Sequence, residues 1–526
     1  MGLLTKASTI LGVPPELLAY ALAKFSRSKA TPETSFLAWL YSVPPNRPEK
    51  FFEEIFHNYG HASVADLAHA PLSLESISIV AAIVALHHRL LDCQERSTRY
   101  MDFSEAAFAT PPELENHAEL KRRYVAQCES LFALYRRLHA DFLRFLSQQY
   151  ADRKEEVETK SAGSFEATIK ARAFDLARYV LPASTLTGVG MMASARTYMA
   201  LISAWSSHPL AEIREMGRRA KEALTILPAD DYALKAVVKY LEELNLPNLP
   251  WEVRKALDEL LEQGGFVLPT LMKHVGENKF IIDARACART FTEKYLTLPP
   301  QFRNEEDSVY GNPVQLIPQS KTLDQIVSSI LFPEAFGLRL GNVLSLVEKI
   351  NDEDKREFLK EIQSLRGDHD PVHEGWAGVG ALTFDVLVDN GAFRDLHRHR
   401  ENRQFLQAPT GAFGCAIPSD FTEAGVDAIM REAFDHSRTL ALDMVEVGLP
   451  VEIMQYALPL AVNIPWVAVM DPRQMGYLTE LRTKSAGHFS YREIAWLMHQ
   501  AVKKEHPFLV DGSRATPFED FDLFSR

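Results

Sequence analysis

The chain has few cysteines, and their spacing excludes the usual cysteine-based sites. Its 526 residues include four cysteines, which are scattered and form no CxxC pair. Such cysteines are typical of free thiols in a reducing compartment, and they form neither a disulfide framework nor a zinc-binding pattern. We therefore expect no metal site. The four are Cys93, Cys128, Cys287 and Cys415.

Long apolar runs and excess positive charge are also lacking. No uncharged apolar run approaches the roughly 18 residues that a membrane span needs. The N-terminal segment has no cleavable signal pattern and is interrupted by Pro14 and Pro15. A net charge of −13 disfavours general attraction to nucleic acid or anionic membranes. We expect a cytoplasmic protein whose partners are small molecules, held in a local basic pocket if they carry phosphate.

One short pattern is present twice. Residues 87–100 read His-His-Arg, seven residues, then Ser-Thr-Arg-Tyr, and residues 398–411 read Arg-His-Arg, seven residues, then Ala-Pro-Thr-Gly. The two segments align at an offset of 311. The front half is altered in the first copy and the back half in the second, so two damaged halves could form one working site.

A second pair of segments supports a repeat. Residues 177–182 match residues 454–459 at an offset of 277, so the first copy holds 34 extra residues between its two blocks. A long helical pattern over 112–152 can hold them. Several ordered matches favour a diverged tandem duplication. The alternative is two unrelated helical domains with coincidental motifs.

The apolar periodicity predicts a helix-rich α+β fold with a sheet backed by long helices in each copy. Strands are expected at 76–85 and 381–388, each leading into one of the two motifs. We expect a first domain over 1–240, a helical connector and loop over 241–315, and a second domain over 316–526. In both copies a helix also precedes a histidine, His61 or His373 in turn.

The second motif offers cationic donors. Arg398 and Arg400 carry planar guanidinium groups suited to bidentate phosphate or carboxylate binding. If the segment is a strand, these two side chains share one face and His399 points the other way. Taken alone, such a triplet is more often solvated surface charge.

The back half of the first motif offers a mixed polar face. Glu95, Ser97 and Arg99 alternate along the chain, so an extended segment projects all three to one side. This set of an acceptor, a hydroxyl and a guanidinium suits a nucleotide. Ser97 lacks a His–Asp partner pattern, so it is not an obvious nucleophile. The simpler interpretation is a salt bridge within a loop.

Together these motifs resemble the flavin-dependent thymidylate synthases, the ThyX family, whose signature is RHR, seven residues and then Ser, continuing as S-x-R-Y. Family members are homotetramers of an α/β subunit, with active sites where subunits meet. The resemblance therefore implies two ThyX-like domains arranged as a pseudo-dimer, and a homodimer of chains that forms a pseudo-tetramer.

The resemblance also implies which copy keeps which part of the site. The first copy keeps the residues of one subunit for dUMP, and the second keeps the share of its neighbour. The positions that have lost the family residue are His87 and Trp205 in the first copy, and Ala408, Thr410 and Gln455 in the second. The losses are complementary.

Residue by residue, the resemblance assigns three roles. The residues implied for dUMP are Glu95, Ser97, Arg99, Arg178, Arg398 and Arg482. Those implied for FAD are His373, Arg398, His399, Arg400, Arg196 and Arg473. Those implied for catalysis are Arg482 and Ser97.

The implied reaction is reductive methylation of dUMP to dTMP at a composite site, with FAD as cofactor and methylenetetrahydrofolate and NADPH as co-substrates. The sequence departs from the family at Asp395, where the family has Gln, and at Ser194 and Asp471, where it has a flavin-contacting Asn. Two alternatives therefore stay open. One is a flavoenzyme acting on another pyrimidine nucleotide, and the other is a non-catalytic nucleotide-binding or scaffold protein.

Overall fold

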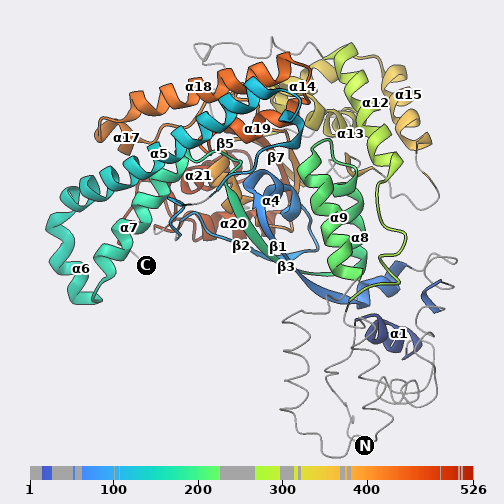
Figure 1. Cartoon of the computed structure of the whole chain (residues 1–526), viewed down its shortest axis with the longest axis horizontal. Coiled ribbons are helices and arrows are strands. Elements are labelled where there is room, and N and C mark those ends of the chain that lie inside the picture. The colour runs from blue at the N-terminus through green and yellow to red at the C-terminus, as the bar shows by residue number, and fades with distance from the viewer. Residues whose placement is uncertain are drawn as a thin grey trace, which may run out of the picture.

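The chain folds into two α+β halves, whose elements overlap at the centre of the view in Figure 1. The structure is a computed structural model, and it describes residues 15–25, 51–53, 62–99, 101–105, 107–225, 267–296, 313–317, 322–365, 367, 373–375, 381–485, 487–507, 510 and 513–524. No helix in this part of the chain is long and apolar enough to cross a membrane.

The first half follows α1 (Pro15–Phe25) and contains three strands and six helices of the described residues. They are β1 (His69–Ser78), α4 (Ile79–Leu86), β2 (Asp92–Glu95), α5 (Ala118–Gln149), α6 (Lys154–Lys160), α7 (Ser164–Ala177), β3 (Leu186–Ser194), α8 (Ala195–Ser206) and α9 (Ala211–Thr225).

The second half begins with α12 and likewise contains both helices and strands. Its described elements are α12 (Lys279–Tyr295), β4 (Val314–Leu316), α13 (Thr322–Leu331), α14 (Leu340–Val347), α15 (Asp352–Ser364), β5 (Leu382–Asp389), α16 (Asn390–Leu396), β6 (Arg403–Leu406), α17 (Ser419–Glu423), α18 (Asp427–Glu446), α19 (Met454–Ala457), β7 (Asn463–Met470), α20 (Pro472–Arg482) and α21 (Phe489–Glu505).

The two sheets have the same core topology. In the first half the strand order is β1-β3-β2, and in the second it is β4-β5-β7-β6. Every pairing is antiparallel. The order β5-β7-β6 repeats β1-β3-β2, and β4 is an extra edge strand of the second sheet. The predicted helix-rich α+β fold with two similar domains is confirmed.

In both halves two strands lead directly into helices through a capping side chain. Ser78 caps α4 by accepting a hydrogen bond from Ala81 N (3.0 Å), and its counterpart at the 311 offset, Asp389, caps α16. At the 277 offset Ser194 caps α8 and Asp471 caps α20. A side-chain oxygen at this position satisfies one of the free N–H groups of the first turn. The two positions linked by resemblance to flavin contact are therefore helix caps here.

One of the two strand predictions is confirmed and the other is wrong. The expected strand over 381–388 is β5, within one residue at each end. The expected strand over 76–85 ends at Ser78, and Ile79–Leu86 forms α4. Nearly every residue of α4 is buried, so its sequence is an apolar run with no clear period, which fits a strand or a buried helix equally well.

The halves meet around a local twofold arrangement. Ala183 N donates to Leu458 O at 2.9 Å, and Leu460 N donates to Leu181 O at 2.9 Å. The 277 offset relates Leu181 to Leu458 and Ala183 to Leu460, so each half makes the same contact on the other. Such exchange of equivalent contacts defines an isologous interface. It lies within one chain here.

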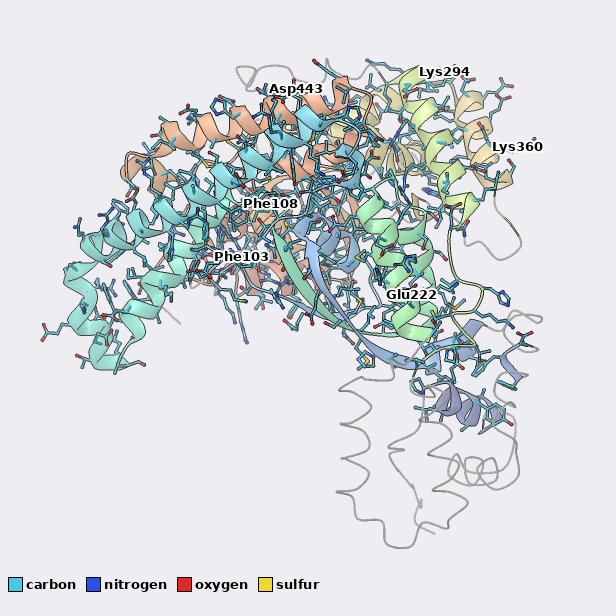
Figure 2. The ribbon with its side chains drawn as sticks, in the orientation of Figure 1. Phe103, Phe108, Glu222, Lys294, Lys360 and Asp443 are labelled. Carbon is cyan, nitrogen blue, oxygen red and sulfur yellow. The ribbon has the colours of Figure 1, made fainter. Side chains whose placement is uncertain are left out.

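Two long helices, α5 and α18, reinforce this interface. They run side by side along one edge of the molecule (Figure 1), with Arg123 of α5 paired to Asp443 of α18 at 2.5 Å. Asp443 projects from α18 at this contact (Figure 2). The expected helix over 112–152 is α5, and α5 and α6 together hold the extra residues of the first copy.

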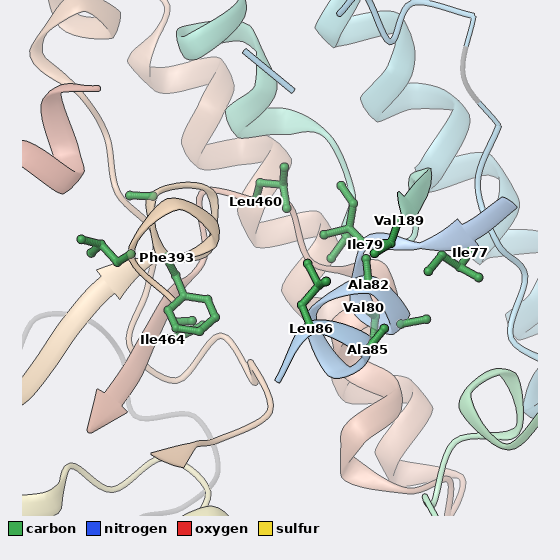
Figure 3. Close-up of a cluster of buried hydrophobic side chains, with 14 of the residues drawn as sticks. Ile77, Ile79, Val80, Ala82, Ala85, Leu86, Val189, Phe393, Leu460 and Ile464 are labelled. Carbon is green, nitrogen blue, oxygen red and sulfur yellow. The ribbon is translucent and has the colours of Figure 1, made fainter. Parts of the chain in front are cut away.

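Two hydrophobic cores support the halves. The larger is continuous across the interface, and Figure 3 shows α4 of the first half near Phe393 and Ile464 of the second. A smaller core joins α12 to α13, α14 and α15. The connector helix α12 thus packs with second-half helices. The proposed boundaries at 240 and 315 stay predictions, and the first lies outside the described residues.

Candidate functional site

The back half of the first motif faces the front half of the second. Glu95, at the end of β2, is 7% exposed and accepts a hydrogen bond from Arg394 Nη2 at 2.5 Å. Its other carboxylate oxygen lies 3.9 Å from Arg398 Nη2. Arg400 donates to the Cys93 Sγ at 2.6 Å and pairs with Asp92 at 3.5 Å. The two segments are about 300 residues apart in sequence and in contact in space.

Two buried arginines share one hydroxyl at the centre of this contact. Thr98 Oγ1 accepts from Arg178 Nη1 at 3.1 Å and from Arg394 Nη1 at 3.2 Å. Arg178 is 2% exposed, and its Nε and Nη2 have no hydrogen-bond partner within the described part of the chain. Its nearest opposite charge is Asp395, at 3.9 Å. A buried cation with unmatched donors is costly, and an anion placed there removes that cost.

A tyrosine brings together one arginine from each half. Arg99 Nη1 donates to Tyr491 Oη at 3.3 Å, and the Arg482 guanidinium lies 5.3 Å from the centre of the same ring. Arg99 is oriented by a bidentate pair with Asp175, at 2.8 and 3.0 Å. Such fork-to-fork pairs fix the plane of the guanidinium.

His399 orients Arg482. The Arg482 Nε donates to His399 Nε2 at 2.9 Å, and Gln474 lies 3.4 Å from the other ring nitrogen. Burial, with Arg482 as a secondary cause, lowers the pKa of His399 to about 3. The imidazole is therefore neutral at neutral pH and accepts from the guanidinium. Arg482 also ends α20, where a cation interacts favourably with the helix dipole.

The local backbone differs from the extended geometry that we expected. Residues 398–400 form a turn after α16, yet Arg398 and Arg400 still face the first half while His399 faces its own half. Beyond β2 the chain also turns, and Ser97 Oγ accepts from Arg99 N at 3.2 Å. As a result the hydroxyl among the arginines belongs to Thr98, and the expected alternation of residues 95, 97 and 99 is wrong.

Two of the predicted FAD residues, His373 and Arg196, do not join this cluster. His373 lines a separate cavity, described below. Arg196 is exposed and pairs with Asp66 at 3.0 Å. Arg473 belongs to α20, but its side chain, like all of His61, lies outside the described residues. The structure thus brings together Glu95, Arg99, Arg178, Arg398, His399, Arg400 and Arg482, with Ser97 in the adjoining turn.

Several residues of the cluster were missed at the sequence level. Arg394, Thr98, Asp175 and Tyr491 hold or orient the predicted arginines, and of these only Thr98 lies in a repeated motif, where the neighbouring Ser97 was assigned instead. Arg394 precedes Arg398 by four residues, a helical spacing that was the one available signal. We call the set Glu95, Thr98, Arg99, Arg178, Arg394, Arg398 and Arg482 the arginine cluster.

The counterparts of the cluster residues lie at a second contact between the halves. There a cavity of about 540 Å³ is lined by His87 and Trp205 of the first half and by Ala408 and Gln455 of the second. The two repeat offsets relate these four residues to Arg398, Arg482, Ser97 and Arg178 in turn. We call this space the second cavity.

The cluster and its geometry define a class of protein. The class is that of α+β proteins with two similar halves. The halves meet at two equivalent junctions, the arginine cluster and the second cavity, and guanidinium groups converge at the first of these. That chemistry suits a phosphorylated ligand, because several preorganised donors converge where an anion can lie.

The comparisons identify the family. Residues 13–228 and 338–508, more than half of the chain, match the Thy1 family, described as thymidylate synthase complementing protein, and the chain belongs to that family. The match in two segments agrees with the tandem arrangement of the fold.

Individual relatives fall into two groups. The UPF0159 protein of Chlamydia muridarum is 26% identical over 90% of this chain and 82% of its own length. The flavin-dependent thymidylate synthase of Saccharolobus solfataricus is 38% identical over 18% of this chain and 36% of its own length. The crystal structure of flavin-dependent thymidylate synthase ThyX from Helicobacter pylori, complexed with FAD and dUMP, covers 41% of this chain and 91% of that chain, at 17% identity and a TM-score of 0.24.

Proposed function

We propose that the chain is a flavin-dependent thymidylate synthase-like enzyme. The reaction is the reductive methylation of dUMP to dTMP, with methylenetetrahydrofolate and NADPH as co-substrates and FAD as cofactor. The site is composite: the first half supplies Glu95, Ser97, Arg99 and Arg178, and the second half supplies Arg398 and Arg482. One such site is expected in each chain.

The observation that carries this proposal is the pair of unmatched donors on Arg178. They point to an anion at a place where arginines of both halves converge. A nucleotide phosphate supplies two negative charges and several acceptor oxygens, which suit guanidinium forks. Membership of the Thy1 family makes dUMP the natural candidate.

The turn at residues 398–400 fits a flavin dinucleotide. The side chains of Arg398 and Arg400 are 34% and 22% exposed, and each makes an ionic contact no shorter than 3.5 Å. Two accessible guanidinium groups on one turn suit a pyrophosphate. When bound, the flavin supplies the redox chemistry, and the protein holds and polarises the substrates.

The protein residues then have separate tasks. Arg178 and Arg99 hold the phosphate, since they come from the half that keeps the back of the motif. Arg482, fixed by the neutral His399, polarises the pyrimidine ring. Ser97 lies in the turn beside Thr98, where its hydroxyl can reach a bound nucleotide. For Arg482 and Ser97, the two residues implied for catalysis, these are the roles that we propose.

Anaerobic turnover tests the proposal. Purified protein supplied with dUMP, methylenetetrahydrofolate, FAD and NADPH should form dTMP, and Arg398→Ala should bind dUMP less tightly. Arg431→Ala on the exposed face of α18 is the matched control. Absence of dTMP, together with unchanged dUMP binding by Arg398→Ala, would contradict the proposal and favour a non-catalytic scaffold.

One observation favours the alternative of another pyrimidine nucleotide. Asp395 lies 3.9 Å from Arg178 and places a carboxylate next to the proposed phosphate site. That charge weakens the attraction for a dianionic phosphate. A panel of pyrimidine nucleotides compared by thermal shift separates the two, because the true ligand stabilises the native state most at equal concentration.

We also propose that two chains associate into a pseudo-tetramer of four similar halves. The twofold contact between halves within one chain is the repeating unit of such an assembly. Sedimentation of the purified protein tests it, with a dimer expected and a monomer contradicting it.

A further inference from the structure

The second cavity is the counterpart of the arginine cluster and has different chemistry. In the first half, α4 and α8 contribute to its walls. In the second half, α19 and the segment that follows β6 contribute. Figure 3 shows part of this region, where α4 lies near Phe393 and Ile464. At about 540 Å³ the cavity has the size of a small-ligand site.

The second cavity is poor in positive charge. Arg285 is the one arginine among its lining residues in the described part of the chain, and no lysine lines it. Arg285 already donates to Ser207 O at 3.1 Å and pairs with Glu334 at 3.7 Å. Burial lowers the pKa of His208 to about 3, and burial also lowers the pKa of His87. Neutral imidazoles and apolar walls do not suit a phosphate.

Three acceptor oxygens on residues that line the cavity lack a hydrogen-bond donor within the described part of the chain. Glu452 and Asn390 are 7% and 1% exposed, and the Glu452 Oε2 and Asn390 Oδ1 have no hydrogen-bond partner in the described residues. The same holds for Gln404 Oε1. All three residues line the cavity. A buried acceptor left without a donor destabilises the protein, so a ligand that presents N–H groups to these oxygens binds more tightly than one without them.

The walls also suit a flat ring. Trp205, 1% exposed, lines the cavity together with Phe280 and Phe336. Aromatic side chains of this kind bind planar ligands through offset stacking or edge contacts. Apolar walls with a few convergent polar groups are the usual form of a small-molecule site.

We propose that the second cavity binds an amino-substituted nitrogen heterocycle that carries no phosphate, such as an aminopyrimidine. The ring packs between the aromatic side chains, and its amino groups donate to Glu452, Asn390 and Gln404. This ligand differs from the phosphorylated substrate proposed for the arginine cluster. One junction of the halves thus binds an anion, and the equivalent junction binds an uncharged ring.

The test uses two matched pairs of probes on the full chain with FAD present. Calorimetry compares 2,4-diaminopyrimidine with unsubstituted pyrimidine, and cytidine with cytidine monophosphate. The measurements are repeated in Arg178→Ala, which disables the other site. In Arg178→Ala the amino-bearing probe without phosphate should bind at least about 10-fold more tightly than its partner in both pairs, and in the parent 2,4-diaminopyrimidine should show the same preference over pyrimidine.

Two variants locate the binding. Glu452→Gln keeps the shape of the side chain and replaces an acceptor oxygen with a donor, so affinity should fall by about 10-fold or more. Ala408→Phe fills the cavity and should abolish binding, with circular dichroism to verify the fold. Absence of binding by 2,4-diaminopyrimidine and cytidine, or equal binding of both members of a pair in Arg178→Ala, overturns the proposal. So does unchanged affinity in Glu452→Gln. A failure of dUMP turnover would leave these readouts unaffected.

Discussion

The two junctions between the halves have related backbones and opposite chemistry. At one, Arg178 and Arg394 share the Thr98 hydroxyl, Arg398 lies 3.9 Å from Glu95, and Arg482 is held by His399. At the other, the counterpart positions hold Gln455, His87 and Trp205 around a largely apolar cavity. The strand order and the helix caps are repeated in both halves. The exchanged side chains give the two junctions different chemistry, and a duplicated fold can carry two kinds of site.

The largest expected effect comes from removing the central cation. Arg178→Ala should weaken dUMP binding by about 100-fold, because a buried charge-assisted contact of roughly 2.7 kcal/mol is lost. Gln455→Ala changes the equivalent residue at the second cavity and should leave dUMP affinity unchanged. Calorimetric dissociation constants for the two variants make the comparison. Equal losses in both would show that the junctions do not differ as proposed.

Thr98→Val tests the shared hydroxyl. Two buried guanidinium groups would each lose an acceptor, so the free energy of unfolding should fall by about 1–3 kcal/mol. Thr439→Val, at an exposed position of α18, is the control and should change stability much less. Urea unfolding midpoints measure both. A Thr98→Val protein as stable as the parent would mean that the hydroxyl does not hold the cluster.

Acid should destabilise both junctions. Burial lowers the pKa of His399 in the cluster and of His208 at the second cavity to about 3 in each case. The unfolded chain takes up protons below its ordinary histidine pKa of 6.5 while the native chain does not, so stability falls as pH decreases from there toward 3.

The expected slope is about 1.4 kcal/mol per pH unit for each such histidine. Unfolding midpoints between about pH 7.5 and about pH 5 measure it. His399→Gln and His208→Gln should each make the dependence shallower. An unchanged slope in both variants would contradict the assigned neutral imidazoles.

The smallest expected effect is an increase in the affinity for dUMP. Asp395→Asn removes the carboxylate beside Arg178 and should tighten dUMP binding by a few-fold, roughly 0.5–1 kcal/mol. Asp443→Asn, which removes the partner of Arg123 on the far helices, is the control. Dissociation constants for dUMP at one salt concentration give the comparison. Weaker binding in Asp395→Asn would show that the carboxylate assists the ligand.

The sequence predicted those parts that depend on local pattern or on repetition. The strand β5 and the helix α5 follow from periodicity, and the contact of residues 95 and 398 follows from complementary loss in two copies. The strand expected over 76–85 is wrong because the Ser78 side chain caps a largely buried helix that begins at Ile79. Apolar residues alone do not distinguish that helix from a strand.

The remaining parts of the site depend on contacts between residues that are far apart in the sequence. Arg394 meets Glu95 and Thr98 across nearly 300 residues, and Tyr491 joins Arg99 to Arg482. No spacing along the chain encodes such contacts, because they arise where the two halves pack. The sequence identified His87, Trp205, Ala408 and Gln455 as positions that have lost the family residue, but it did not predict that they surround one cavity.

The number of dUMP molecules bound by each chain tests the central claim most directly. Titration calorimetry of the full chain should give one dUMP per chain, because one junction keeps the arginines and the other has lost them. That single site should disappear in Arg178→Ala and persist in Gln455→Ala. Two sites per chain, no site, or a site that survives Arg178→Ala would contradict a nucleotide site divided between the halves.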